Sequence, residues 1–159
     1  MVKIMNKTNV MRLLDAAKIE YIGHEYKADP SMSGADIAKI LGEDPCKVFK
    51  TLVTRGKSGG YYVFVVPVEA ELDLKKAAKA AGEKSIEMIK QKELLPLTGY
   101  VHGGCSPIGM KKAFPTFIHE TAVLCERIFV SAGKVGCQIE LAAEALIKAV
   151  PCHVSDITA

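Results

Sequence analysis

A short apolar run with a lysine inside it, Val48-Phe49-Lys50-Thr51-Leu52-Val53-Thr54, constrains the fold more than any other stretch. Valine, phenylalanine, threonine and leucine dominate this run, which is typical of a strand with both faces covered. Strand alternation places Lys50 on the same face as Val48 and Leu52. An ammonium group among apolar neighbours needs a partner or an anionic substrate unless its head reaches water. Lys50 is therefore the first candidate for a functional residue, beside the alternative of a structural lysine that extends into solvent.

The rest of the chain predicts helices and strands in alternation. Apolar periodicity and capping residues predict helices at 8–17 (capped by Thr8 or Asn9), 33–41, 74–81, 86–94 and 143–149, and a helical turn at 44–47. Strands are expected at 21–26, 48–54, 61–68, 116–119, 127–131, 137–141 and 152–154, with glycine loops at 56–60, 103–109 and 132–136. Several links have hairpin length, so we expect an α/β fold with a mixed, barrel-like sheet surrounded by helices.

Length and composition exclude several classes of protein. A chain of 159 residues is most simply one domain, 1–159. Five cysteines without a CxxC pair argue against a disulfide framework, a zinc ribbon and a thiol redox protein. The longest apolar runs are too short to span a membrane, and the N-terminus has no apolar signal region, so a cytoplasmic location is expected. The formal charge of +3 permits a polyanionic partner.

A glycine-rich stretch, Gly103-Gly104-Cys105-Ser106-Pro107-Ile108-Gly109, is the second candidate for a site. Adjacent glycines let backbone N–H groups approach an anion or a carbonyl closely. The stretch is not a P-loop, because Met110 stands where the phosphate-binding lysine belongs. It is not a nucleophile elbow either, because Ile108 replaces the second glycine of GxSxG. A tight turn remains the alternative.

Three further features have both a functional and a structural interpretation. The glycine loop 131–136 is either a hairpin turn or a backbone cradle with the Ser131 hydroxyl and the Lys134 charge. His102 is either a site residue beside Gly103 or a strand-end histidine satisfied by the backbone. Five lysines form either a basic rim for phosphates or a solvated face; they are Lys75, Lys76, Lys79, Lys111 and Lys112.

The order of these motifs resembles that of a known family. The segments 48–52, 72–76, 103–112, 131–134 and 139–142 together resemble the YbaK/EbsC-type Cys-tRNA(Pro) deacylases, which are relatives of the editing domain in bacterial prolyl-tRNA synthetase. The likeness covers roughly Lys7 to Ile157. It implies removal of cysteine from the 3′ end of tRNA(Pro), with no metal or organic cofactor. It also implies prolyl-tRNA synthetase as a partner, and leaves a monomer and a homodimer both open.

The resemblance also implies which residues form the site. The family's essential lysine falls on Lys50, and Cys105 is expected to be an apolar filler. Substrate contacts are implied for Tyr26, Thr51, Gly103, Gly104, Ser106, Pro107, Ser131, Gly133, Lys134 and Gln138. Two positions depart from many relatives: Gln138 replaces an acidic residue and Ser33 an aromatic one, and both bear on which amino acid is accepted.

The chemistry of this family needs no protein nucleophile, because the thiol of the substrate cysteine attacks its own ester. The resemblance leaves the enzyme to orient the ester and stabilise the oxyanion, with backbone N–H groups near Gly103 and Gly104 as donors and Lys50 at the terminal nucleotide. Two alternatives stay open. One is a deacylase for another mischarged tRNA, such as Ala-tRNA(Pro), and the other is a non-catalytic protein that binds tRNA or the synthetase.

Overall fold

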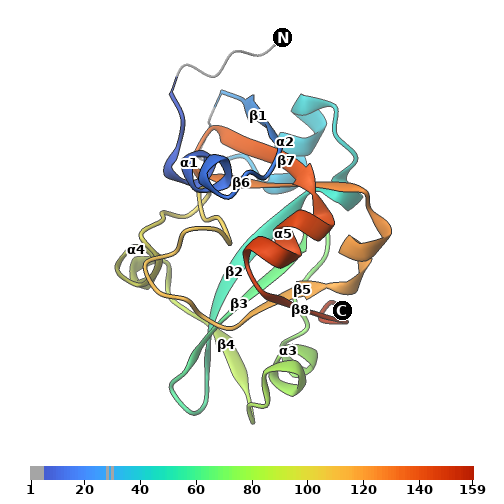
Figure 1. Cartoon of the computed structure of the whole chain (residues 1–159). Helices are drawn as coiled ribbons and strands as arrows, with labels where there is room; N and C mark the ends of the chain where they lie inside the picture. Colours follow the sequence, from blue (N-terminus) through green and yellow to red (C-terminus); the bar gives the residue numbers. More distant parts are fainter. Residues whose placement is uncertain (1–5, 28, 30) are drawn as a thin grey trace.

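The computed structural model describes residues 6–27, 29 and 31–159, so the first five residues of the predicted domain lie outside this part (Figure 1). The strands are Tyr21–Glu25 (β1), Phe49–Gly56 (β2), Tyr61–Pro67 (β3), Ile86–Met88 (β4), Thr116–His119 (β5), Arg127–Lys134 (β6), Cys137–Ala142 (β7) and Cys152–Ser155 (β8). The α-helices are Asn9–Ala16 (α1), Gly34–Leu41 (α2), Leu74–Ala81 (α3), Gln91–Thr98 (α4) and Ala143–Ala149 (α5). Short 3₁₀ helices lie at Pro45–Lys47 (η1) and Glu120–Leu124 (η2). No helix among the described residues is both long and apolar enough to cross a bilayer.

The strands form two sheets. The larger has the order β4-β2-β3-β5-β8, with antiparallel pairs around β2 and parallel pairs from β3 to β8. The smaller, β1-β7-β6, is antiparallel throughout. A parallel bridge between Val48 and Phe129 links the two. The predicted mixed α/β fold is confirmed, but the strands divide between two sheets instead of closing into one barrel.

Strand β2 lies at the centre of the molecule and is covered on both faces, as its composition predicts. Phe49 and Val53 belong to the larger core, which lies between the sheets and is covered by α1 and α5. Leu52, on the opposite face, packs against a second core built around Phe64 and Ile157, which α3 covers at the lower end of the view in Figure 1. Lys50 therefore lies on a rigid, doubly packed strand.

The predicted helix ends are confirmed where local chemistry determines them. The Thr8 hydroxyl accepts a hydrogen bond from the Met11 N–H at 3.3 Å and caps α1. Ser33 and Asp36 form a reciprocal capping box at the start of α2. Gly42 ends α2 in the left-handed conformation that glycine adopts without steric cost.

The helix predicted at 86–94 and ended by Pro96 is only partly correct, because residues 86–88 form a strand and the helix covers Gln91–Thr98. Ile86 starts the short strand β4, where it pairs with Gly56 on β2 and is buried in the second core. Helix α4 begins only afterwards and contains Pro96 within its last turn, where the Gly99 N–H closes the helix on the Leu95 carbonyl at 2.9 Å. Pairing with β2 and burial determine the strand conformation of residues 86–88. The local spacing of apolar residues does not reveal this pairing.

The glycine loop predicted at 132–136 is partly a strand. Strand β6 continues to Lys134, with a bulge-like register shift against β7 between Ser131 and Lys134. Gly133 has φ +91°, and a Cβ on it would lie 2.9 Å from the Tyr100 ring. Glycine is required there for backbone conformation and for close packing.

Candidate functional site

A cavity of about 360 Å³ opens where the first residues of β2 meet the smaller sheet. Its wall comes from the start of β2, the later part of β6, the start of β7, the start of α2 and the loop before Ser106. Six of the predicted site residues line it: Tyr26, Lys50, Thr51, Gly103, Ser131 and Gln138. Ser33 lines it as well, although its hydroxyl is used to cap α2. The cavity therefore gathers residues from three of the motifs, 48–52, 103–112 and 131–134, together with Tyr26 and Gln138.

Lys50 contributes the positive charge of this cavity. It lies opposite Val66 on β3 and is half-buried. Within the described part of the chain, no carboxylate forms an ion pair with its ammonium group, in contrast to Lys76, which pairs with Asp156. An ammonium group that lines a cavity without a protein counter-ion can bind an anionic or electron-rich ligand group.

Thr51 contributes a hydroxyl group without a partner. Its Oγ1 is buried and makes no hydrogen bond to any described residue. The hydroxyl of Thr54, further along the same strand, donates to the Tyr62 carbonyl at 3.0 Å. A buried hydroxyl without a partner is unusual and calls for an explanation. Because Thr51 lines the cavity, a hydrogen bond from its hydroxyl to a bound ligand would explain the missing partner.

The glycine-rich loop approaches the cavity with Gly103 and Cys105, whereas Gly104 is used to hold the loop in place. The Gly104 N–H donates to the Val101 carbonyl at 3.0 Å, so it is not free to stabilise an oxyanion as expected. Among the described residues, the N–H groups of Gly103 and Cys105 have no hydrogen-bond partner. These two N–H groups are therefore the donors that the loop leaves available beside the cavity, and the Cys105 donor was not predicted.

Two other residues of this loop, Ser106 and Pro107, are buried and do not line the cavity. The Ser106 hydroxyl accepts a hydrogen bond from the Ile108 N–H at 3.3 Å. The Tyr100 hydroxyl donates to the Ile108 carbonyl and fixes the loop from the other side. Both bonds shape the backbone, which assigns Ser106 a structural role.

Only Ser131 of the predicted Ser-x-Gly-Lys loop lines the cavity. Its hydroxyl accepts from the Gly133 N–H at 3.2 Å and still has a proton to donate. Gly133 packs against Tyr100, and Lys134 is exposed and outside the cavity wall. The structure therefore places neither Gly133 nor Lys134, for which substrate contacts were predicted, in the cavity wall.

Gln138 contacts a carboxylate that sequence reasoning missed. When the Glu43 carboxylate is ionised it can only accept, which assigns the Gln138 amide nitrogen to the side facing it, 2.7 and 2.9 Å from its two oxygens. Burial, with repulsion from Glu140, raises the pKa of Glu43 to about 7. Burial also raises the pKa of Tyr26, which keeps its phenol neutral. No local pattern marks Glu43, since its partner is on a distant strand.

The cavity offers no activated protein nucleophile. Cys105 lines it, but burial raises the pKa of its thiol to about 12, so the thiol stays protonated. Burial also raises the pKa of Cys137, the other cysteine in the wall. No set of three or more His, Cys, Asp or Glu side chains in the described ranges is placed to hold a metal ion.

Two pairs of alternatives that the sequence left open, for His102 and for the five lysines, can be compared with the structure. His102 is exposed at the cavity wall, and no described backbone group satisfies its ring nitrogens, so the strand-end interpretation is wrong. None of the five lysines that form either a basic rim or a solvated face lines the cavity. Lys76 instead bonds to Asp156 at 3.0 Å and to the Thr158 carbonyl at 2.8 Å, which holds the C-terminal segment.

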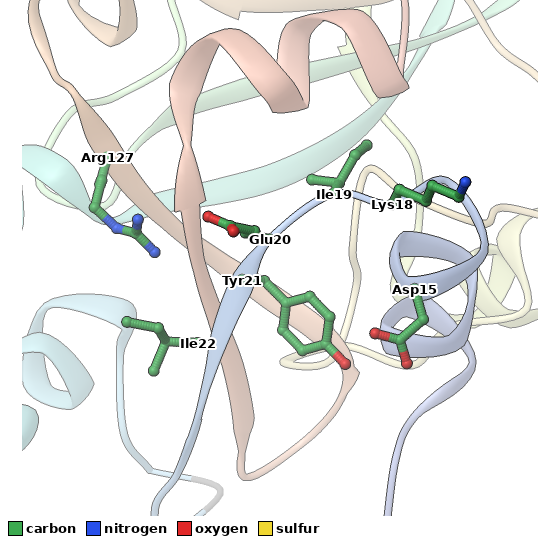
Figure 2. Close-up of a pocket in the computed structure, with 7 residues that line it drawn as sticks. All are labelled: Asp15, Lys18, Ile19, Glu20, Tyr21, Ile22 and Arg127. Atoms are coloured by element: carbon green, nitrogen blue, oxygen red, sulfur yellow. The ribbon is translucent and has the colours of Figure 1, made fainter.

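A larger, shallow depression of about 700 Å³ lies elsewhere, between α1 and β6 (Figure 2). Figure 2 shows Asp15 and Lys18 on the α1 side, Arg127 on the far side and Tyr21 between them. Two of its four charged residues are already paired, because Asp15 bonds to Lys7 at 2.6 Å and Arg127 to Glu140 at 3.1 Å. The smaller cavity at Lys50 is therefore the candidate site.

The sequence matches a family model described as the aminoacyl-tRNA editing domain over residues 28–149. It is 46% identical over 157 residues to a protein of Enterococcus faecalis named "Putative Cys-tRNA(Pro)/Cys-tRNA(Cys) deacylase EbsC". That match covers 98% of this chain and 96% of the relative.

The chain is also similar to part of a curated relative and, in its fold, to a solved structure. A segment of 93 residues, 58% of this chain, is 30% identical to 16% of a proline–tRNA ligase of Fervidobacterium nodosum. The fold matches the crystal structure of a protein described as a "putative trans-editing enzyme for prolyl tRNA synthetase", with a TM-score of 0.81 and 21% identity. That match covers 97% of this chain and 99% of the other.

Proposed function

Because this chain belongs to the aminoacyl-tRNA editing domain family, we propose that it removes cysteine from Cys-tRNA(Pro) in trans. The proposed substrate rests on the name of the 46% identical relative, which aligns over 98% of this chain. The overall reaction is hydrolysis of the ester between cysteine and the terminal ribose, which releases free tRNA. The sequence 1–159 would then carry a single editing domain.

The composition of the cavity wall is the observation that carries this proposal. It combines the Lys50 ammonium group, the unpartnered Thr51 hydroxyl and the free N–H groups of Gly103 and Cys105. These groups bind and orient an ester, but the wall contains no thiolate or carboxylate that could attack it. Such a wall suits a substrate that carries its own nucleophile.

In the mechanism we propose, the thiol of the bound cysteine attacks its own ester carbonyl. A carbon–sulfur bond forms, the ester carbon–oxygen bond breaks, and the thiol proton passes to the departing ribose oxygen. Water then opens the resulting cyclic thioester to give free cysteine. The N–H groups of Gly103 and Cys105 would stabilise the developing oxyanion, and the Lys50 ammonium group would stabilise the departing oxygen or the terminal phosphate.

Selection of tRNA(Pro) would come from a partner. A cavity of about 360 Å³ accommodates an aminoacyl end and little more of a tRNA. The lysines expected to form a basic rim do not line it, which leaves few groups for reading the tRNA body. Prolyl-tRNA synthetase is the candidate partner, as the similarity to part of a proline–tRNA ligase suggests.

The test compares cleavage of Cys-tRNA(Pro), Ala-tRNA(Pro) and Ser-tRNA(Pro) by the purified chain. The proposal predicts loss of the cysteine ester alone, because alanine has no nucleophile and a hydroxyl is a far weaker one than a thiol. Cleavage of Ala-tRNA(Pro) would still show that the protein is a deacylase, but it would contradict attack by the substrate thiol. If no ester is cleaved, the proposal of an enzyme is wrong, and the alternative of a non-catalytic binding protein takes its place.

A further inference from the structure

We propose that Glu43 fixes the orientation of the Gln138 side-chain amide, so that Gln138 presents its oxygen to the α-ammonium group of the aminoacyl ester. The inference rests on the proposed function, because the ammonium group belongs to that substrate. It makes Glu43 a positioning residue that acts through Gln138. Glu43 is not itself part of the cavity wall.

The geometry around the two side chains restrains both of them. Gln138 is only 5% exposed, lies in the centre of the smaller sheet and lines the cavity. Glu43 follows the left-handed Gly42, and its N–H donates to the Ala38 carbonyl at 2.8 Å. In the orientation assigned for an ionised Glu43, both carboxylate oxygens lie within 2.9 Å of the amide nitrogen, and the amide oxygen faces away from Glu43. This orientation turns Gln138 into a hydrogen-bond acceptor for a ligand.

A substrate ammonium group needs such an acceptor in this cavity. The wall contains the positive Lys50 and neither an aspartate nor a glutamate. The oxygen of Gln138, polarised by the carboxylate behind it, then supplies the negative end of a dipole without placing a full charge beside Lys50. The pair Glu43–Gln138 thus balances two cationic groups, one from the protein and one from the substrate.

The charges around Glu43 make this arrangement sensitive to pH. His24 on β1 bonds to Glu140 on β7 at 2.9 Å, and Arg127 on β6 bonds to Glu140 at 3.1 Å. Burial and the charge of Glu140 raise the pKa of Glu43 to about 7, against the opposing effects of His24 and Gln138, and Tyr26 beside it stays neutral.

Below that pH, a protonated Glu43 can donate to the amide oxygen of Gln138. The amide can then turn and present its NH₂ group to the cavity, where it would oppose an ammonium group. The preferred orientation of Gln138, and with it the affinity for the substrate, would therefore change near neutral pH.

The first test measures kcat and KM for Cys-tRNA(Pro) with wild type and Glu43→Gln between about pH 5.5 and 8. The exposed Glu144→Gln, which makes the same chemical change far from the cavity wall, is the control. At about pH 8 we expect Glu43→Gln to raise KM about tenfold with little change in kcat. Wild type should lose kcat/KM as the pH falls through about 7, and Glu43→Gln should lack this loss. Titration of the substrate amine is common to all three proteins, so superimposable profiles would overturn the inference.

The second test does not depend on catalysis. The side-chain amide signals of Gln138 in ¹H–¹⁵N spectra should shift with a midpoint near 7 in wild type and stay fixed in Glu43→Gln. Signals that do not move in wild type would overturn the coupling. If wild type cleaves no ester, the proposed function fails, while these spectra still decide whether Glu43 orients Gln138.

Discussion

Gly104 lies so close to Val135 that a Cβ on the glycine would come within 2.9 Å of the Val135 backbone nitrogen. The glycine-rich loop is thereby packed directly on the turn between β6 and β7. Gly103 and Cys105, on either side of this contact, are the residues whose N–H groups are free at the cavity. The contact therefore fixes the part of the loop that carries both residues.

Gly104→Ala should displace this loop and lower both stability and activity. The new methyl group meets backbone atoms that cannot turn aside, so we expect a loss of about 1–3 kcal/mol in the free energy of unfolding. Urea denaturation measures this loss. Gly60→Ala is the matched control, because its Cβ would be 3.4 Å from the Tyr62 hydroxyl, in ordinary contact. Equal stability of the two variants would contradict the packing role of Gly104.

Thr51→Val should separate stability from activity. The substitution keeps the side-chain shape and removes a buried hydroxyl without a protein partner, so stability should hold or rise. The loss of a hydrogen bond to the substrate should lower kcat/KM about tenfold. Thr54→Val removes a bond of 3.0 Å to the Tyr62 carbonyl and should instead cost about 1 kcal/mol of stability. An unchanged kcat/KM in Thr51→Val would exclude a substrate contact.

Cys105→Ala should keep the deacylase activity. With its pKa at about 12, the thiol stays protonated at neutral pH and does not attack the ester, so the rate should stay within about threefold of wild type. Iodoacetamide at neutral pH should modify the exposed Cys46 well before the buried Cys105, as peptide mass spectrometry would show. Complete loss of deacylation in a folded Cys105→Ala would assign the nucleophile to the protein.

Glu43→Gln should stabilise the protein at alkaline pH. Folding raises the pKa of Glu43 from 4.5 to about 7, so the folded chain binds this proton more tightly than the unfolded chain does. The contribution of Glu43 to stability therefore falls as the pH rises through this window. Relative to wild type, Glu43→Gln should gain about 1 kcal/mol between about pH 5 and 8, since solvent screens a half-buried carboxyl. Thermal unfolding of both proteins over this range measures the gain, and parallel curves would contradict the raised pKa.

Sequence patterns identified the features that depend on neighbouring residues. Thr8 and Ser33 cap the start of a helix and Gly42 ends one, each through contacts a few residues away. These three predictions are confirmed. The helix predicted to start at Ile86 was wrong there for the opposite reason. The conformation of Ile86 depends on pairing with Gly56 on the neighbouring strand.

The candidate site shows the same division. The residue types around Lys50 and Gly103 predict a ligand cavity, and the structure brings these two residues into one wall. Sequence motifs do not distinguish residues that line a cavity from residues that hold its wall, as Gly104 and Ser106 show. Glu43 is visible only once the folded chain places it beside Gln138.

The most direct test of the account is single-turnover deacylation of Cys-tRNA(Pro) by Lys50→Ala. The control is Lys57→Ala, an exposed lysine at the far end of the β2–β3 hairpin. We predict that Lys50→Ala lowers the rate at least about 100-fold with an unchanged unfolding transition, whereas Lys57→Ala retains the wild-type rate. If Lys50→Ala cleaves the ester at the wild-type rate, the cavity at Lys50 is not the site of deacylation.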